Sequence, residues 1–485
     1  MKRSMMQTVF LLVFLLYPLC AGASVIQEKV YDICKYGAKG DGKTLNTNAI
    51  NSAIEYCAEN GGGTVLIPKG TFLSGTIYLK DNISLVLRKG AVLKGTADVS
   101  QYKSYTPLGN LSMFDSGGDG ENANSAIDPH WNRALILGVG VSNISIEGEG
   151  IIDGNHVFDS EGEENMRGPH TIIIAESRNI LMRGITLNCA SNYAFMAYKI
   201  EDMVFHDLEF NEGWDGIHIR GGKNITIRNC RFFTGDDAIA GGYWENMVIS
   251  DCHINSSCNG VRMIMPATGL TISNCTFAGP GKYPHRTSKE KKRNNMLSAI
   301  ILQPGGWGKA PGKIRDIYIH DVSIDNMNNP LMIVLNEGNT GDNILVERMK
   351  ATRISQAAVS IESWKGGTFG NVTFRDISIS YEGNKNPELK NLQVSQPPAD
   401  SRLLPCWGWY ARNVQNMVLE NVELNYRGED VRPAFWLNNV GKTELIQVNY
   451  TGSKNEKKWN IKTQGAFVEI FSLIGELEQL GCFQE

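Results

Sequence analysis

The chain has 485 residues, of which 51 are glycine and only 20% are charged, and its formal net charge is −4. This length allows several average domains, but repetitive and large all-β folds reach it as one unit. A weakly acidic chain has no basic surface for nucleic acid, so a nucleic-acid partner is excluded. The densest basic run, at 289–293, is interpreted as a solvated loop, with an arm over an acidic ligand as the alternative.

Residues 1–23 have the pattern of a secretory signal peptide. A basic start precedes an apolar stretch at 9–19, and Ala21-Gly22-Ala23 fits a cleavage site. The stretch is shorter than the roughly 20 residues that span a membrane. We therefore expect a secreted or periplasmic protein without a membrane span, with lipid attachment at Cys20 as the weaker alternative. Removing Lys2 and Arg3 leaves 45 basic residues of 47, against 51 acidic ones, a net charge of −6.

The next element predicted is a helix over residues 41–60, within an N-terminal cap region at 24–80. Candidate N-caps are Thr44, Asn46 and Thr47. Apolar residues recur at helical spacing: Ala49, Ile50, Ala53, Ile54 and Cys57. A helix here would cover the unpaired edge of the first strands that follow.

The main body is repetitive. Five similar segments begin 23, 22, 22 and 23 residues apart, at Asn179, Asp202, Asn224, Asn246 and Gly269. Weaker copies begin near Asn143, Asp316, Asn343, Asn371 and Asn416. Each copy is a short alternating strand, and strands at this period with no helix between them predict a right-handed parallel β-helix. We expect one all-β domain over 24–485; leucine-rich repeats would need a Leu framework that is missing.

The repeat assigns positions to two inward-facing columns. The first holds Ile185, Leu208, Cys230, Cys252 and Cys275, and the second holds Leu187, Phe210, Phe232, Ile254 and Phe277. The three cysteines are therefore expected to be buried apolar residues rather than disulfide partners. Asn224 and Asn246 fall in a turn column and predict an asparagine ladder. Residues 100–133 and the inserted loop 278–297 break the period and predict loops beside the solenoid.

Polar residues follow the strands in two further columns. One holds Asn192, Asp215, Asp237 and Asn259, and the other holds Ser191, Trp214, Asp236 and Cys258. Because adjacent coils stack about 4.8 Å apart, Asp215 and Asp237 should be direct neighbours with Asp236 beside them. Three close carboxylates raise at least one pKa, which places a protonated acid beside ionised bases. A metal site or a solvated turn is the alternative.

The motifs at 213–217 (GWDGI) and 234–240 (TGDDAIA), with the stretches at 36–44 and 144–154, resemble glycoside hydrolase family 28, the polygalacturonases and related pectinases. The resemblance implies a right-handed parallel β-helix that hydrolyses pectic oligo- or polysaccharide with inversion and without cofactor or metal. It places the general acid at Asp236 and the water-activating pair at Asp215 and Asp237. We expect a monomer.

Three motifs of the family are altered here. Its Asn-Thr-Asp motif reads Gly213-Trp214-Asp215, and two substrate-contact motifs are lost. Residues 257–260 (SCNG) lack the family's histidine, and the strand at 298–304 lacks its cation. These departures favour a related linkage, such as one in rhamnogalacturonan or branched pectin. The expected substrate contacts are Arg262, Trp214, His218, Asn259, His285 and Arg286. His218 and Arg220 are among the cations that could replace those of the lost motifs, with an ordinary surface strand residue as the alternative. For His285 the alternative is an ordinary loop residue. Trp307 and Trp364 are weaker sugar-stacking candidates.

Two other functions fit the same residues. A polysaccharide lyase or epimerase on this fold would use a basic residue and calcium, with the aspartates as oxygen ligands. A non-catalytic carbohydrate-binding solenoid would explain the missing histidine, although all three carboxylates are retained.

Overall fold

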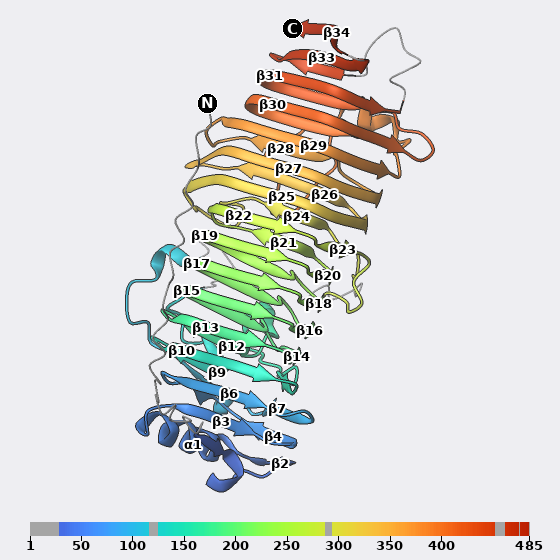
Figure 1. Cartoon of the computed structure of the whole chain (residues 1–485). Coiled ribbons are helices and arrows are strands. Elements are labelled where there is room, and N and C mark those ends of the chain that lie inside the picture. Colours follow the sequence, from blue (N-terminus) through green and yellow to red (C-terminus); the bar gives the residue numbers. More distant parts are fainter. Residues whose placement is uncertain (1–28, 116–124, 287–292, 452–460, 475, 485) are drawn as a thin grey trace, which may run out of the picture.

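The computed structural model describes residues 29–115, 125–286, 293–451, 461–474 and 476–484. The proposed signal peptide with Cys20, and most of the basic run at 289–293, lie outside these residues. Within them the chain forms a right-handed parallel β-helix whose coils stack from the N-terminal to the C-terminal end (Figure 1). The predicted fold class is therefore confirmed. In the same residues, none of the helices is long and apolar enough to cross a membrane.

The N-terminal strands are β1 (Val30–Asp32), β2 (Asp41–Leu45), β3 (Gly63–Ile67), β4 (Gly70–Ser74), β5 (Ile77–Tyr78), β6 (Ile83–Leu87), β7 (Ala91–Gly95), β8 (Lys103–Ser104), β9 (Arg133–Val139), β10 (Ser142–Gly148), β11 (Ile151–Asp153) and β12 (His170–Ala175). The central strands are β13 (Arg178–Arg183), β14 (Thr186–Asn188), β15 (Phe195–His206), β16 (Glu209–Asn211), β17 (Ile217–Arg228), β18 (Arg231–Thr234), β19 (Ile239–Ser250), β20 (His253–Ser256), β21 (Asn259–Met263), β22 (Ala267–Ser273), β23 (Thr276–Ala278) and β24 (Ser298–Leu302). The C-terminal strands are β25 (Gly312–Met327), β26 (Asn329–Leu335), β27 (Asn339–Ile354), β28 (Val359–Ser363), β29 (Phe369–Tyr381), β30 (Trp409–Tyr426), β31 (Phe435–Tyr450), β32 (Ile461–Gln464), β33 (Phe467–Ile474) and β34 (Glu476–Gln484).

The N-terminal end is closed by helix α1 (Thr47–Glu59), which lies beside the first strands (Figure 1). The predicted helix over 41–60 was wrong at its start, because residues 41–45 form β2 and pair with β4. Asn46 is at the N-cap position but makes no side-chain cap bond. Its Oδ1 atom instead accepts a hydrogen bond from the backbone N–H of Lys39 at 2.7 Å, which holds the preceding loop. The predicted apolar face is confirmed: Ile50, Ala53, Ile54 and Cys57 are buried.

The coil register is the one that the repeat predicts. Ile180 pairs with Met203, Met203 with Ile225, Ile225 with Met247, and Met247 with Leu270. The asparagine ladder is also present, because Asn224 Nδ2 donates to Asp202 Oδ1 at 2.9 Å and Asn246 Nδ2 to Asn224 Oδ1 at 3.3 Å. These asparagines have left-handed φ values of 55° and 57°, which asparagine tolerates better than most residues.

Both predicted inward columns are buried in one continuous core. Phe210 and Phe232 stack with ring centroids 4.8 Å apart, and Cys230, Cys252 and Cys275 are free, buried thiols. The cysteines therefore fill the core as small apolar groups, as predicted. The two polar columns lie outside this core, at the turns between strands.

Candidate active site

The three aspartates lie where two neighbouring coils turn into strands β17 and β19. Ile217 pairs with Ile239, so Asp215 and Asp237 stand at equivalent positions in adjacent coils. The backbone N–H of Asp237 donates to Asp215 Oδ1 at 3.2 Å. Asp237 Oδ1 in turn accepts from Asn259, at 3.0 Å from the backbone N and 2.9 Å from Nδ2. The predicted polar column is thus a continuous chain of hydrogen bonds.

Asp236 lies beside this column and contacts an imidazole and a guanidinium. His285 Nε2 is 3.4 Å from Asp236 Oδ1, and Arg167 Nη2 is 3.6 Å from Asp236 Oδ2. Arg167 is itself paired with Glu163 at 3.4 Å and with Glu164 at 3.1 Å. Asp236 therefore belongs to a charged cluster. The inserted loop 278–297 contributes His285 to it, and the loop between β11 and β12 contributes Arg167.

Arg262, on β21, closes the opposite side of the column. Its Nη1 lies 3.4 Å from Asp237 Oδ2, and its Nη2 lies 3.4 Å from Asp400 Oδ1. Nη2 also donates to the carbonyl of Ala399 at 2.8 Å. The guanidinium carbon is 5.0 Å from the ring centre of Trp307. Ala399 and Asp400, which are far away in the sequence, thus hold Arg262 in place beside Asp237.

His218 and Arg220 are buried next to the aspartates, not on the outer surface, and Arg220 lines the same cavity as they do. His218 Nδ1 is 2.8 Å from Asp215 Oδ2, and Arg220 Nε donates to His218 Nε2 at 3.1 Å. Because Nε2 accepts, the proton of the neutral ring is on Nδ1 and is donated to Asp215. The ring stacks on Tyr193 at 4.8 Å. His218, predicted as a substrate contact, is 3% exposed and instead supports Asp215 from below.

Trp214 is covered by a neighbouring side chain. Its indole N–H donates to the carbonyl of Ser191 at 3.0 Å, and the guanidinium carbon of Arg167 lies 3.7 Å from its ring centre. The turn needs glycine at 213, where φ is +87° and a Cβ would come within 2.8 Å of Ala190. A sugar cannot stack on the Trp214 face that Arg167 already occupies.

The electrostatic environment distinguishes the three carboxyl groups. Burial, followed by the charges of Asp236 and Asp237, raises the pKa of Asp215 well above its usual value. Burial also raises the pKa of Asp237, against the opposing effect of Arg262. Burial acts to raise the pKa of Asp236 too, but His285, Arg167 and Arg262 outweigh it and hold that pKa below its usual value. The cluster therefore combines two carboxyl groups with raised pKa values and one with a lowered pKa.

These groups line a cavity of about 260 Å³. Its walls include five residues that the sequence singled out as catalytic or substrate-binding: Asp215, Asp236, Asp237, Arg262 and His285. The other four predicted site residues are not in its walls: Trp214, His218, Asn259 and Arg286. Trp307 is in the wall and Trp364 is not. Arg286 instead contacts His156.

Arg293, the last residue of the basic run whose alternative interpretation was an arm over an acidic ligand, also lines the cavity. Sequence reasoning missed four other charged residues of the cavity: Glu163, Glu164, Arg167 and Asp400. Three of them lie between β11 and β12, where Ile144 pairs with Ile180, 36 residues later. Asp400 lies between β29 and β30, where Val372 pairs with Met417, 45 residues later. Both spacings exceed the 22 or 23 residues of the regular coils, and this excess is the signal that could have located the inserted loops.

Three groups of side chains bring possible metal ligands within 4.8 Å of one another in the described part of the chain. One is the three aspartates, and a second is Asp236 with Cys258 and His285. Oxygen ligands suit calcium or magnesium, but Arg262 and Arg167 already contact these carboxylates. The third group, His156, Cys189 and Glu212, lies outside the cavity walls.

Comparison with known proteins gives three findings. A family model described as rhamnogalacturonase A/epimerase, pectate lyase-like, matches residues 30–262. An exopolygalacturonase of Arabidopsis thaliana is 25% identical over 388 residues, covering 75% of this chain and 82% of its own. The structure of a family 28 exopolygalacturonase of Yersinia enterocolitica aligns with a TM-score of 0.53 and 16% identity, over 91% of this chain and 78% of that one.

A surface adhesin of Streptococcus pneumoniae, PfbA, shares the fold as well, with a TM-score of 0.56 and 16% identity over 93% of this chain and 99% of that one. The fold is thus common to an exopolygalacturonase and an adhesin, and it does not by itself define an activity. The resemblance to the polygalacturonases of glycoside hydrolase family 28 is confirmed by the sequence matches.

Proposed function

We propose that the protein is an exported glycoside hydrolase that cleaves galacturonosyl-type linkages in pectic oligo- or polysaccharide. The observation that carries the proposal is the cluster of Asp215, Asp236 and Asp237 in the wall of one cavity. Hydrolysis of a glycosidic bond needs a carboxylic acid and a carboxylate on either side of the bond. Sequence relatives named as polygalacturonases support the pectic class of substrate.

In this proposal Asp236 protonates the leaving oxygen, and Asp215 and Asp237 activate water in their ionised forms. Because burial raises the pKa of both groups, they act as bases only above those raised pKa values. The cations around Asp236 favour its ionised form before substrate binds. A proton must therefore reach Asp236 as substrate enters the cavity, where its carboxyl group lies 3.4 Å from His285 Nε2 and 3.6 Å from Arg167 Nη2. Asp237, held by Arg262 and Asn259, stays oriented while it accepts a proton from water.

The charges of the cavity bear on which pectic sugar fits. Arg167 and Arg262 supply positive charge where the family's own cationic motif is absent, but each is paired with protein carboxylates. A uronate carboxylate would compete with Glu163, Glu164 or Asp400 for these arginines. This arrangement supports a linkage other than that of plain polygalacturonan, such as one in rhamnogalacturonan or a branched pectin.

The test is a panel of defined pectic fractions, with release of reducing sugar measured for the purified protein and for Asp236→Asn. Hydrolysis gives saturated products and continues in the presence of a chelator. An ultraviolet-absorbing unsaturated product would establish a lyase instead, and a changed sugar configuration without chain cleavage would establish an epimerase. Binding of a fraction without turnover of any would leave a carbohydrate-binding solenoid.

The stereochemistry is a separate test. Acid and base of an inverting enzyme are about 6.5–9.5 Å apart, and those of a retaining enzyme about 5–5.5 Å. Oxygen atoms of the three carboxylates lie within 4.8 Å of one another; these nearest-oxygen distances are shorter than separations between whole carboxyl groups. We propose inversion, on the resemblance to the family. Nuclear magnetic resonance of the first anomer released decides it.

A further inference from the structure

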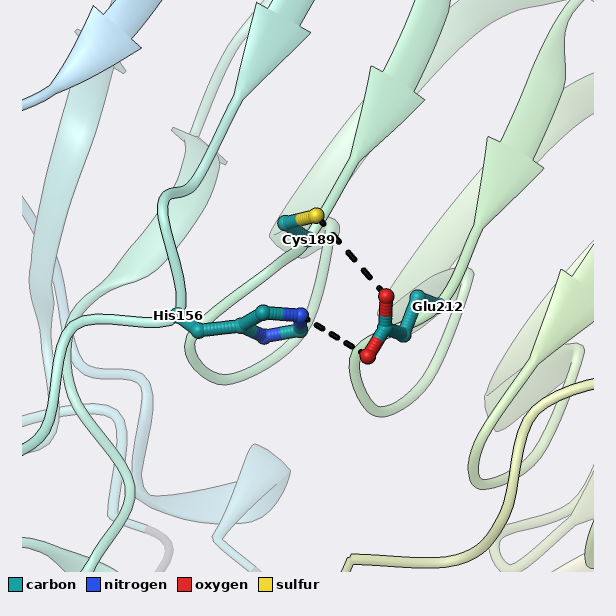
Figure 2. A group of neighbouring side chains, drawn as sticks. All are labelled: His156, Cys189 and Glu212. Carbon is teal, nitrogen blue, oxygen red and sulfur yellow. Dashed lines mark hydrogen bonds and ion pairs between the residues drawn. The ribbon is translucent and has the colours of Figure 1, made fainter.

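A second chemical cluster lies on the turns of three successive coils. His156, Cys189 and Glu212 follow strands β11, β14 and β16, and their side chains point toward one another (Figure 2). Asp153 pairs with Asn188 and Asn188 with Asn211, so the three turns are in register. The backbone N–H of His156 also donates to the carbonyl of Cys189 at 2.9 Å. The parallel coils therefore hold these side chains together.

All three residues have left-handed backbone conformations, with φ values of 47° at His156, 51° at Cys189 and 63° at Glu212. Such values are uncommon for cysteine and glutamate, whereas glycine, asparagine, aspartate and histidine adopt them more readily. A histidine, a cysteine and a glutamate thus occupy turn positions that elsewhere in this chain mostly hold asparagine or aspartate. Local backbone preference does not explain the cysteine and the glutamate at these positions, whereas a ligand shared with the histidine would.

The distances between the side chains suit a small metal ion. His156 Nε2 is 3.0 Å from Glu212 Oε1, and Cys189 Sγ is 3.9 Å from Glu212 Oε2. Ligands at about 2.0–2.3 Å from a tetrahedral zinc ion are separated by about 3.3–3.7 Å from one another. Small side-chain rotations therefore bring the three atoms onto one ion, with the fourth position left for water.

We propose that His156, Cys189 and Glu212 form a binding site for a thiophilic divalent cation, of which Zn²⁺ is the best match. Imidazole nitrogen and thiolate sulfur select zinc over calcium or magnesium, which require oxygen ligands. The carboxylate of Glu212 and the nearby carboxylate of Asp153 add negative charge. Zinc binding at this place does not depend on the proposed hydrolase activity.

Protonation sets the conditions for binding. Burial, then Arg286, lowers the pKa of His156, so its ring is neutral at pH 7 and available as a ligand. Burial, then Asp153 and Glu212, raises the pKa of Cys189 to about 11, so the metal must displace the thiol proton. Affinity should therefore fall as the pH falls, and binding should release protons.

Arg286 is the competitor of the metal. Its Nη1 contacts His156 Nδ1, which keeps the ring proton on Nε2, the atom that faces Glu212. A zinc ion on Nε2 requires that proton to move, and its charge repels the guanidinium. The adjacent residue, His285, contacts Asp236 in the cavity. Occupation of the zinc site should therefore displace Arg286 and disturb the contact between His285 and Asp236.

The test uses the full chain, reduced and freed of metal, titrated with Co²⁺ and Zn²⁺ alone. We expect one Co²⁺ per chain, with a thiolate charge-transfer band that Zn²⁺ abolishes. Cys189→Ala should remove the band, and Glu212→Gln should weaken binding by at least the roughly 10- to 100-fold typical of losing an outer-shell partner. Arg286→Ala should strengthen binding.

The matched control is Cys258→Ala, because Cys258 belongs to the other sulfur-containing group, with Asp236 and His285. A band that persists in Cys189→Ala and disappears in Cys258→Ala would overturn the proposal, as would absence of the band in both the wild type and Arg286→Ala. Melting curves of the metal-free variants identify any that do not fold; if Cys189→Ala is one, the Glu212→Gln and Arg286→Ala affinities decide.

Inhibition by Zn²⁺ is a second readout and rests on the proposed function. Zn²⁺ should inhibit hydrolysis by the wild type, and Cys189→Ala should be resistant while retaining its metal-free activity. If the protein proves inactive on every glycan, the Co²⁺ spectrum still tests the site. If Co²⁺ does not bind, the hydrolase proposal is unaffected.

Discussion

The backbone N–H of Asp237 donates a hydrogen bond to Oδ1 of Asp215 in the adjacent coil, at 3.2 Å. One oxygen of Asp215 is held by this bond and the other by His218 at 2.8 Å. The side chain is thus oriented by both the solenoid and the residues beneath it. A carboxyl group with so little access to water is costly to ionise, which gives a direct prediction.

Asp215→Asn should stabilise the protein at neutral pH. Burial, then Asp236 and Asp237, raises the pKa of Asp215 in the folded protein. At a pH between the pKa of the unfolded chain and that of the folded protein, the unfolded chain has released this proton and the folded protein still holds it. This carboxyl group therefore destabilises the fold increasingly as the pH rises above about 4. Asparagine cannot ionise and so removes this cost, although its amide NH2 group replaces one of the two accepting oxygens. We expect a gain of about 0.5–2 kcal/mol at pH 7.

Urea unfolding at pH 7 and at pH 4 measures this effect. The gain should shrink toward zero at the lower pH. An equal gain at both pH values, or a loss at pH 7, would show that folding does not raise the pKa of Asp215.

Arg262→Gln should move the acidic limb of the pH profile. Burial raises the pKa of Asp237 and Arg262 opposes that rise, so removing the arginine raises the pKa further. If Asp237 acts as an ionised base, kcat/KM should begin to fall at a higher pH than in the wild type. Arg231→Gln is the control, because the Arg231 side chain is 62% exposed and lies 3.8 Å from Glu209. Identical profiles for both variants would rule out this role of Arg262.

Thiol labelling tests the inward columns. Cys230, Cys252 and Cys275 are buried, whereas Cys34 is exposed and Cys189 is partly exposed. In the native protein a thiol reagent should label Cys34 first and Cys189 more slowly, and leave the three core cysteines unmodified until the chain is denatured. Peptide mapping by mass spectrometry distinguishes them. Rapid native labelling of Cys252 would contradict the register of the coils.

Phe232→Ala should cost about 3–5 kcal/mol of unfolding free energy, because it leaves a cavity in the core. Phe232 is fully buried and stacks on Phe210 at 4.8 Å. Phe158→Ala, at a position 63% exposed, should change stability by less than about 0.5 kcal/mol. Comparable effects from both substitutions, measured by urea unfolding, would argue against the predicted inward face.

The regular coils could be predicted because every 22 or 23 residues repeat the same alternation of apolar and polar positions. Stacking then determines which distant residues become neighbours, and this placed Asp215 beside Asp237. The capping helix was located by its apolar spacing, but its start was not. Residues 41–45 pair with β4 through their backbone, and such pairing leaves little trace in side-chain pattern.

The outer part of the site could not be predicted in the same way. Arg167 and Asp400 come from loops inserted into enlarged coils, where no repeat fixes the position of a residue. Arg262 was predicted from its place on β21, and its partners were not. In the sequence, His218 occupies a position that alternates with buried residues of its strand, which predicts an exposed side chain. In the structure it is buried and contacts Asp215, which the sequence pattern does not reveal.

The most direct test of the proposed function compares Asp236→Asn with Asp251→Asn on the pectic fraction that the wild type cleaves best. Asp251 is an exposed aspartate on a nearby turn with φ of +55°, a conformation that asparagine tolerates. We expect Asp236→Asn to lower kcat by about 10²–10⁴-fold, the usual contribution of a general acid, with melting temperature preserved. Asp251→Asn should retain full activity. Equal kcat values for wild type and Asp236→Asn would contradict the account.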